Sequence, residues 1–305
     1  MLTNLVMYTL VWIPLGVKAS GRHHVREHRL GTTEGDLFPS LGRRKNFVNK
    51  STATDSRLSL EELAILNRQF ETAPAGKVIA WAVETFGQSV VLAASFEDVV
   101  LIDLATKAAP GIEVIFLDTE AHFPETLSFV EEIRARYHLN LTVTKPGPEA
   151  AAYPCGSDQC CQFRKVAPLR QAVQGSRAWL TSLKRVDAAS RANAPIVGWD
   201  DAFGLVKVNP LATWTNDDIA SYLADHDLPV HPLVSRGYRS IGCAPTTRPV
   251  QEGEDPRAGR WAGLDKIECG LTLSPDAARP GQPLRDGIPR SRPAAPLHTS
   301  VPQHR

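Results

Sequence analysis

The residues with the clearest chemical potential lie near the end of the chain. Cys243 and Cys269 share a glycine- and proline-rich segment with Arg257 and Arg260. Glycine and proline break regular structure, so this segment is predicted to be a mobile flap. Arginines three residues apart can bind the oxygens of a phosphate or sulfate group together. Cys269 lies among Lys and Glu residues that predict exposure, and an exposed thiol beside fixed positive charge suits attack on an anionic sulfur or phosphorus ester. The alternatives are solvated surface arginines and an idle thiol.

A second group of thiols lies in "PCGSDQCCQFRK", which contains Cys155, Cys160 and Cys161. Neighbouring thiolates can reach different corners of one metal ion or cluster. Lys165 follows Cys161 by four residues, so on a helix it would face the same side and compensate thiolate charge. The alternative is a pair of small buried thiols beside a surface lysine. An odd number of cysteines with an adjacent pair is a poor disulfide framework and favours a cytosolic metal or catalytic role.

Two further candidates lie where predicted strands end. Ser95 stands at a strand-to-helix junction, where it could cap the helix, and the free amides of such a helix start can bind a phosphate. An ordinary capped helix is the alternative. Lys184 and Arg185 end another strand, where a ligand would bind, although such a basic pair is commonly a solvated surface.

The elements that must position these residues alternate along the chain. Apolar periodicity predicts helices at 58–71, 75–87, 97–108, 124–138, 160–175 and 215–227, and strands at 89–95, 113–119, 139–145, 177–185 and 204–211. Thr215 and Asp218 form a candidate capping box. This order predicts a doubly wound α/β fold with a mostly parallel sheet and a ligand at the carboxyl ends of its strands.

Charge and composition limit the function further. The chain of 305 residues carries 34 Lys and Arg against 33 Asp and Glu, which argues against a broad nucleic-acid-binding surface. Its first 20 residues are apolar but have no Lys or Arg before Lys18 and are short for a membrane span. We expect a cytoplasmic protein with no membrane segment. The expected organisation is a disordered extension (1–56), an α/β nucleotide-binding domain (57–235), a flap (236–273) and a disordered tail (274–305).

Several stretches together resemble one family over about residues 60–273. These are "CCQFRKVAPLR", "RVDAASRANAP", "VKVNPLATWT", "HPLVSRGYRSIGCAP", "GEDPRAGRW" and "ECGL". In order and spacing they resemble the assimilatory adenylyl-sulfate and phosphoadenylyl-sulfate reductases. The resemblance implies a pyrophosphatase-type nucleotide-binding fold. It also implies that Cys269 attacks the sulfate sulfur and displaces AMP, or its 3'-phosphorylated form. The resulting S-sulfocysteine would then release sulfite to thioredoxin or a similar dithiol.

The same resemblance assigns the other site residues. It implies substrate contacts by Ser95, the strand end Leu117-Asp118-Thr119, Lys165, the Lys184-Arg185 pair, Arg257 and Arg260.

The family's [4Fe-4S] pattern is incomplete here. Members that use adenylyl sulfate hold the cluster on a Cys-Cys pair and a later Cys-x-x-Cys. Cys160, Cys161 and Cys243 match, but the fourth position is Thr246. Cys155 could supply the fourth thiolate from the preceding loop. A three-thiolate cluster with an exogenous ligand, no cluster, and a zinc ion on four thiolates are the alternatives.

Two smaller departures concern the catalytic motifs. "ECGL" is followed by Thr272 rather than His, and "TSLKR" replaces the family's "TGLRR", so that Lys184 lacks bidentate geometry. We expect a thioredoxin-dependent adenylyl-sulfate reductase. The alternatives are a phosphoadenylyl-sulfate reductase and a catalytically degraded nucleotide-binding partner protein.

Overall fold

A computed structural model describes residues 57–264 and 266–271, which belong to one compact unit. Its centre is a six-stranded sheet in the order β3-β2-β1-β4-β6-β5. The strands are β1 (Val90–Ala94), β2 (Glu113–Leu117), β3 (Asn140–Thr144), β4 (Ala178–Leu180), β5 (Val197–Asp200) and β6 (Leu205–Val208). All neighbours pair in parallel except β5, which runs antiparallel to β6 at the edge. The predicted mostly parallel α/β sheet is therefore confirmed.

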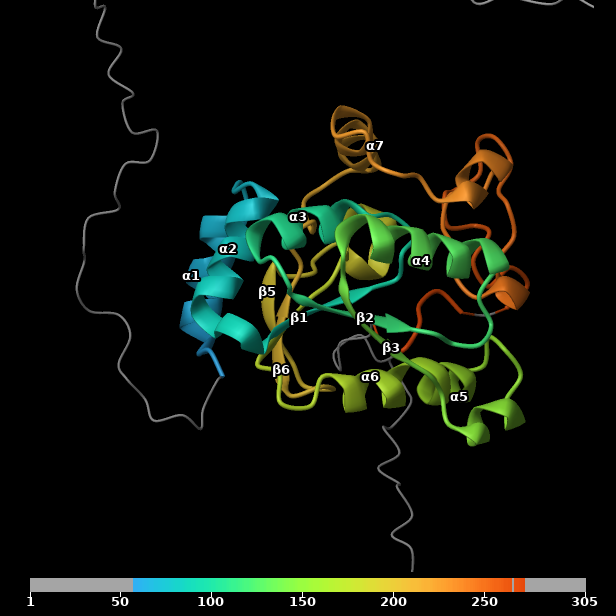
Figure 1. Ribbon diagram of the computed structural model, residues 1–305, viewed down its shortest axis with the longest axis horizontal. Coiled ribbons are helices and arrows are strands. Elements are labelled where there is room, and N and C mark those ends of the chain that lie inside the picture. Colours follow the sequence, from blue (N-terminus) through green and yellow to red (C-terminus); the bar gives the residue numbers. More distant parts are fainter. Residues whose placement is uncertain (1–56, 265, 272–305) are drawn as a thin grey trace, which may run out of the picture. The chain divides into compact units, whose positions relative to one another are not determined.

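Helices cover both faces of this sheet (Figure 1). They are α1 (Leu60–Phe70), α2 (Ala75–Phe86), α3 (Val100–Ala108), α4 (Pro124–Tyr137), α5 (Asp158–Cys161), α6 (Ala167–Ala172) and α7 (Asn216–Asp225). α3 and α4 lie on one side of the sheet, and α5 and α6 lie on the other (Figure 1). The Thr215 hydroxyl and the Asp218 carboxylate form the predicted capping box of α7.

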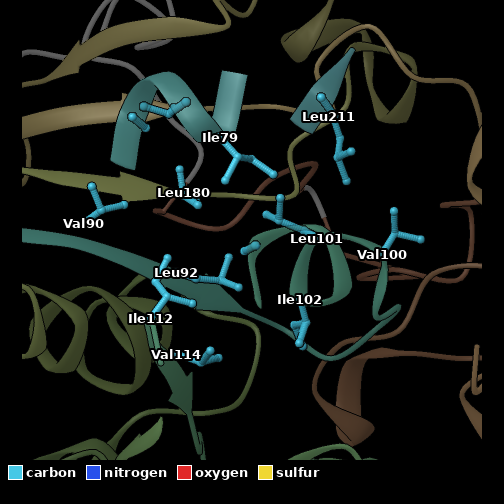
Figure 2. Close-up of a cluster of buried hydrophobic side chains, with 14 of the residues drawn as sticks. Ile79, Val90, Leu92, Val100, Leu101, Ile102, Ile112, Val114, Leu180 and Leu211 are labelled. Carbon is cyan, nitrogen blue, oxygen red and sulfur yellow. The ribbon is translucent and has the colours of Figure 1, made fainter. Parts of the chain in front are cut away.

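The period-two alternation of β1 explains why both faces must be covered. Val90 and Leu92 pack into the larger core with residues such as Ile79 of α2 and Leu101 of α3 (Figure 2). Val91 between them faces the opposite side and belongs to a smaller cluster, whose other buried members are Ile115, Leu169, Val173, Trp179 and Leu205. A strand that is buried on both faces reads as a continuous apolar run, as β1 does.

The structure corrects three details. Ser95 does not cap α3, which begins at Val100; the Asp98 carboxylate instead accepts a hydrogen bond from the Val100 amide at 3.0 Å. The helix expected at 160–175 contains a π-helical turn over Gln162–Val166. The edge strand β5 was not predicted, because four residues interrupted by Gly198 leave little periodicity.

The C-terminal segment, residues 236–264 and 266–271, contains the short 3₁₀ helix Ala244–Thr246 and little other regular structure. An antiparallel bridge between Thr247 and Arg260 closes its central loop. The predicted extension (1–56), the predicted tail (274–305) and Thr272 lie outside the described residues. Within the described ranges, no helix combines the length and apolar character that crossing a bilayer requires.

Candidate active site

A cavity of about 920 Å³ lies at the carboxyl ends of the strands. Ala94 and Ser95 line it after β1, Leu117 and Thr119 after β2, and Thr181 after β4. β1 and β4 are neighbours at the point where the strand order reverses direction. In a doubly wound sheet this is the place where the two crossovers diverge and leave a crevice for a ligand.

Tight turns carry the chain out of β1 and β2 at this cavity. Phe96 has a φ of 57° and Glu120 a φ of 55°, both in the left-handed region that non-glycine residues rarely occupy. Such backbone costs about 1–3 kcal/mol and persists where the surrounding packing enforces it. The buried Phe96 ring supplies that packing, because it meets Phe116 edge-on at 5.3 Å. Exposed Ser95 can therefore present its side chain and amide to the cavity.

Asp118 does not line the cavity, although its neighbours do. Its carboxylate accepts a hydrogen bond from the Glu120 amide at 3.0 Å and lies 3.3 Å from the Lys145 ammonium. The buried Thr119 hydroxyl is instead in contact with the Cys243 thiol at 3.6 Å. Asp118 thus shapes the turn, and Thr119 lies at the cavity.

The structure separates the predicted Lys184–Arg185 pair. Lys184 lines the cavity, and its ammonium lies 3.2 Å from the Asp187 carboxylate. Arg185 points away, where its guanidinium donates to both carboxylate oxygens of Glu71, at 2.5 and 3.0 Å, and to the Ala194 carbonyl. Arg185 therefore anchors the strand-end loop to the end of α1.

Arg257 and Arg260 both reach the cavity and share one buried partner. Their guanidinium groups donate to the Ser240 hydroxyl at 3.4 and 3.0 Å. Arg260 also lies over the Trp261 ring at 4.7 Å. Gly242 makes room for it, because a Cβ on Gly242 would lie 2.8 Å from Arg260 Nε. Burial and the nearby charges of Arg191 and Arg260 lower the pKa of Arg257, so a bound anion would relieve this crowding.

Cys269 lies half-buried at the cavity wall, in surroundings that the sequence did not predict. The Lys and Glu surroundings predicted an exposed Cys269, but its neighbour Glu268 is buried. Arg191 donates to both of its carboxylate oxygens, at 2.6 and 2.7 Å. Burial raises the pKa of Glu268, but the hydrogen bonds and charge of Arg191, together with the charge of Arg257 and the Ser190 hydrogen bond, lower it overall.

Three cations surround the Cys269 thiol electrostatically: Lys165, Arg191 and Lys207. Lys165 lines the cavity. Its burial opposes the charged form, but thiolates at Cys269, Cys243 and Cys161 together raise the pKa of Lys165. Lys207 reaches the segment through a hydrogen bond to the Leu271 carbonyl at 3.3 Å. Positive charge around a thiol favours the thiolate, which is the nucleophilic form.

Cys243 also lines the cavity, and all five cysteines are thiols rather than disulfides. The Cys155 side chain hydrogen-bonds with those of Cys243 and Cys160. This contact lowers the pKa of Cys243 and raises that of Cys155. Cys161, the neighbour of Cys160, accepts a hydrogen bond from the Lys266 ammonium at 3.3 Å.

The loop after Cys155 lies against the residue that replaces the family's fourth ligand. A Cβ on Gly156 would be 3.0 Å from the Thr246 Cγ2 atom. Over the described part of the chain, no three His, Cys, Asp or Glu side chains are grouped closely enough to hold a single metal ion.

Sequence reasoning missed several residues that the structure brings to the cavity or its thiols: Arg164, Asp187, Arg191, Lys207, Lys266 and Glu268. The i,i+4 spacing of Asp187 and Arg191 in "RVDAASRANAP" was a usable signal, since the two side chains lie 3.2 Å apart. The bond from Arg164 to the Thr119 carbonyl, at 2.6 Å, joins parts of the chain that no local pattern connects.

Comparison with known proteins shows which family this chain resembles in sequence. A family model described as "Phosphoadenosine phosphosulfate reductase domain" matches residues 89–249. An adenosine 5'-phosphosulfate reductase of Streptomyces coelicolor is 42% identical over 233 residues, which cover 72% of this chain and 99% of that protein. One from Mycobacterium tuberculosis is 44% identical over 242 residues, or 70% of this chain and 95% of that protein.

A solved structure agrees with these sequence matches. The phosphoadenylyl-sulfate reductase of Candida auris, a phosphate complex, superposes with a TM-score of 0.56 and 26% identity. The match covers 63% of this chain and 98% of that one. This chain belongs to the adenosine 5'-phosphosulfate and phosphoadenosine phosphosulfate reductase family.

Proposed function

We propose that this protein reduces adenylyl sulfate to sulfite and AMP in sulfate assimilation. The observation that carries the proposal is the position of Cys269, a thiol among Lys165, Arg191 and Lys207 at the wall of a strand-end cavity. The identity of 42–44% to adenosine 5'-phosphosulfate reductases supports adenylyl sulfate as the substrate. The cavity of about 920 Å³ is large enough for a nucleotide of this size.

The cavity offers distinct partners to the two ends of this substrate. Ser95 and Thr119, at the ends of β1 and β2, would contact the adenylyl end. Lys165, Lys184, Arg257 and Arg260 would bind the phosphate and sulfate oxygens through charge-assisted hydrogen bonds. Asp118 and Arg185 would act indirectly, by holding the turn after β2 and the loop after β4.

The first chemical step uses only the chain's own groups. The Cys269 thiolate attacks the sulfate sulfur, and the bond between that sulfur and the bridging oxygen of AMP breaks. The electron pair leaves on the AMP phosphate, whose negative charge the nearby arginines stabilise. The product on the protein is an S-sulfocysteine at Cys269.

The second step requires a dithiol reductant such as thioredoxin. One thiolate of the reductant attacks Cys269 Sγ, and sulfite leaves with the electron pair of the S–S bond. The second thiol of the reductant resolves the mixed disulfide, which returns the Cys269 thiol. The reductant thereby loses two electrons and the sulfate sulfur gains two.

This sequence of steps needs Cys269 to face two partners in turn. We therefore treat residues 57–235 as the nucleotide-binding domain and residues 236–273 as a flap that opens to the reductant. The described part of this flap, residues 236–264 and 266–271, has little regular structure, which supports this division. Reduced thiols as catalytic groups and a thioredoxin-type reductant favour a cytoplasmic setting.

We also propose that Cys155, Cys160, Cys161 and Cys243 hold a [4Fe-4S] cluster. Support comes from the contacts of Cys155 with Cys160 and Cys243, and from the place of Thr246 beside Gly156. A four-iron cluster keeps its thiolates further apart than a single ion does. A bound cluster would fix negative charge beside Lys165 and so set the electrostatics of the cavity wall.

Turnover of the two nucleotides tests the proposed function. Under anaerobic conditions with thioredoxin, sulfite should form from adenylyl sulfate. Faster turnover of the 3'-phosphorylated nucleotide would identify a phosphoadenylyl-sulfate reductase instead. Binding of both nucleotides without sulfite release would identify a protein that has lost its chemistry.

A further inference from the structure

Glu268, the residue before Cys269, is a buried carboxylate that accepts three side-chain hydrogen bonds. Its side chain is 2% exposed and accepts hydrogen bonds from Arg191 at 2.6 and 2.7 Å and from the Ser190 hydroxyl at 3.0 Å. The Arg257 guanidinium lies 3.7 Å away. A buried carboxylate is costly unless it is paired and hydrogen-bonded in this way.

Arg191, the main partner of Glu268, is itself held by other residues that line the cavity. Arg191 also bonds to Asp187 at 3.2 Å, and Asp187 lies 3.2 Å from Lys184 at the end of β4. Through Arg191 and Asp187, Glu268 thus connects the backbone beside Cys269 to Lys184 in the loop after β4. Consecutive Cα atoms are about 3.8 Å apart, so this connection restricts Cys269 directly.

Two further attachments flank the same position. Lys266, whose side chain is 10% exposed, donates to Cys161 Sγ and to the Ser157 carbonyl, both at 3.3 Å, and lies 2.9 Å from the 94% exposed Asp158 carboxylate. The Leu271 carbonyl accepts from Lys207 at 3.3 Å. Of the ion pairs at these three positions, only those of Glu268 have little exposure on both sides, and water competes effectively for an exposed ion pair but not for a buried one.

We propose that Glu268 is the positioning residue that seats Cys269 in the cavity, through its buried two-point bond with Arg191. The catalytic part of this inference rests on the proposed function. The seating itself does not, because it governs the exposure of the Cys269 thiol when no substrate is present. The negative charge of Glu268 matters, since a neutral side chain of the same shape cannot hold two guanidinium bonds equally well.

The test compares Glu268→Gln with Glu131→Gln, a control that removes an exposed carboxylate 3.5 Å from Arg134 on α4. Each protein is treated anaerobically with iodoacetamide, and peptide mass spectrometry follows the alkylation of every cysteine. A charge-assisted bond contributes about 1.5–3 kcal/mol, so Cys269 in Glu268→Gln should react roughly 10- to 100-fold faster than in the control. Cys160, Cys161 and Cys243 should keep their rates.

Two outcomes would overturn the proposal. One is a Cys269 rate in Glu268→Gln that equals the control. The other is a parallel rise at all buried cysteines, which indicates general loosening of the fold.

A single-turnover assay then tests the consequence for catalysis. With saturating adenylyl sulfate and no reductant, S-sulfonation should slow by about tenfold or more in Glu268→Gln, while AMP affinity stays within a few-fold. Glu268→Asp, which keeps the charge, should recover part of the rate. If the wild-type protein forms no adduct, the proposed function fails while the alkylation result still stands. Adduct formation by Glu268→Gln at the wild-type rate would refute positioning.

Discussion

Replacing Cys155 with serine should remove the proposed cluster, although the family pattern contains no cysteine with an assigned role at this position. Cys155 interacts with the thiols of Cys160 and Cys243, and Thr246 stands where the family pattern that the sequence resembles places the fourth ligand. Without Cys155 only three thiolates remain. We expect iron to fall from about four atoms per chain to about one or fewer after anaerobic purification. Any remaining cluster should be lost to a chelator at least about tenfold faster.

A second substitution makes this prediction sharp. Thr246 Cγ2 lies 3.0 Å from the Cβ that Gly156, the neighbour of Cys155, would carry, so we expect a thiol at position 246 to lie close to the place of Cys155. Thr246→Cys added to Cys155→Ser should therefore restore about four irons per chain. Gln159→Ser, an exposed change in the adjacent helix α5, is the control. Iron, labile sulfide and the visible absorption of the cluster are measured together with AMP binding, which should persist in every variant.

Two results would refute this reasoning. Full and stable iron loading in Cys155→Ser would mean that an exogenous group is the fourth ligand. Zinc without iron or labile sulfide in the wild-type protein would mean that the thiols hold a structural ion instead.

Three further changes test other parts of the structure. Burial lowers the pKa of His231 to about 4, so below pH 6.5 protons bind the unfolded chain more tightly than the folded one. The wild-type protein should therefore lose about 2 kcal/mol of unfolding free energy through His231 between pH 7 and pH 5. His231→Gln should remove this loss, which urea unfolding at the two pH values measures. A pH dependence identical to wild type would contradict this assignment. Gly242→Ala should displace Arg260 and weaken AMP binding by about tenfold without lowering Tm, whereas unchanged affinity by calorimetry would show that Arg260 has room to move. Arg257→Ala should raise the Kd of adenylyl sulfate by roughly 10- to 100-fold, and Arg236→Ala, an exposed control, should not; equal effects would exclude a specific anion contact.

Local patterns in the sequence predict the main elements well. The apolar runs of β1 and β2 and the periodicity of α2 and α3 follow from burial on two faces and on one face, respectively. The capping box at Thr215 needs only neighbouring residues. β5 was not predicted, because pairing with β6 rather than its own periodicity makes it a strand.

The candidate site likewise has features that local patterns predict and features that only long-range contacts determine. Residues at strand ends, such as Lys184 and Thr119, could be placed from topology alone. The direction of a side chain could not: Arg185 turns to Glu71, which is 114 positions away. Cys269 was predicted to be exposed because Lys and Glu residues surround it in the sequence. The fold instead brings Arg191 to the neighbouring Glu268, across 77 positions, and buries that carboxylate. Long-range ion pairs leave no periodic trace in the sequence.

The central claim is that Cys269 is the nucleophile, and intact-protein mass after anaerobic incubation with adenylyl sulfate tests it most directly. Thioredoxin is omitted so that the intermediate accumulates. The account predicts a gain of one sulfonate group in the wild-type protein, none in Cys269→Ser, and removal of the group when thioredoxin is added. An adduct that persists in Cys269→Ser, or no adduct in protein that binds the nucleotide, would contradict the account.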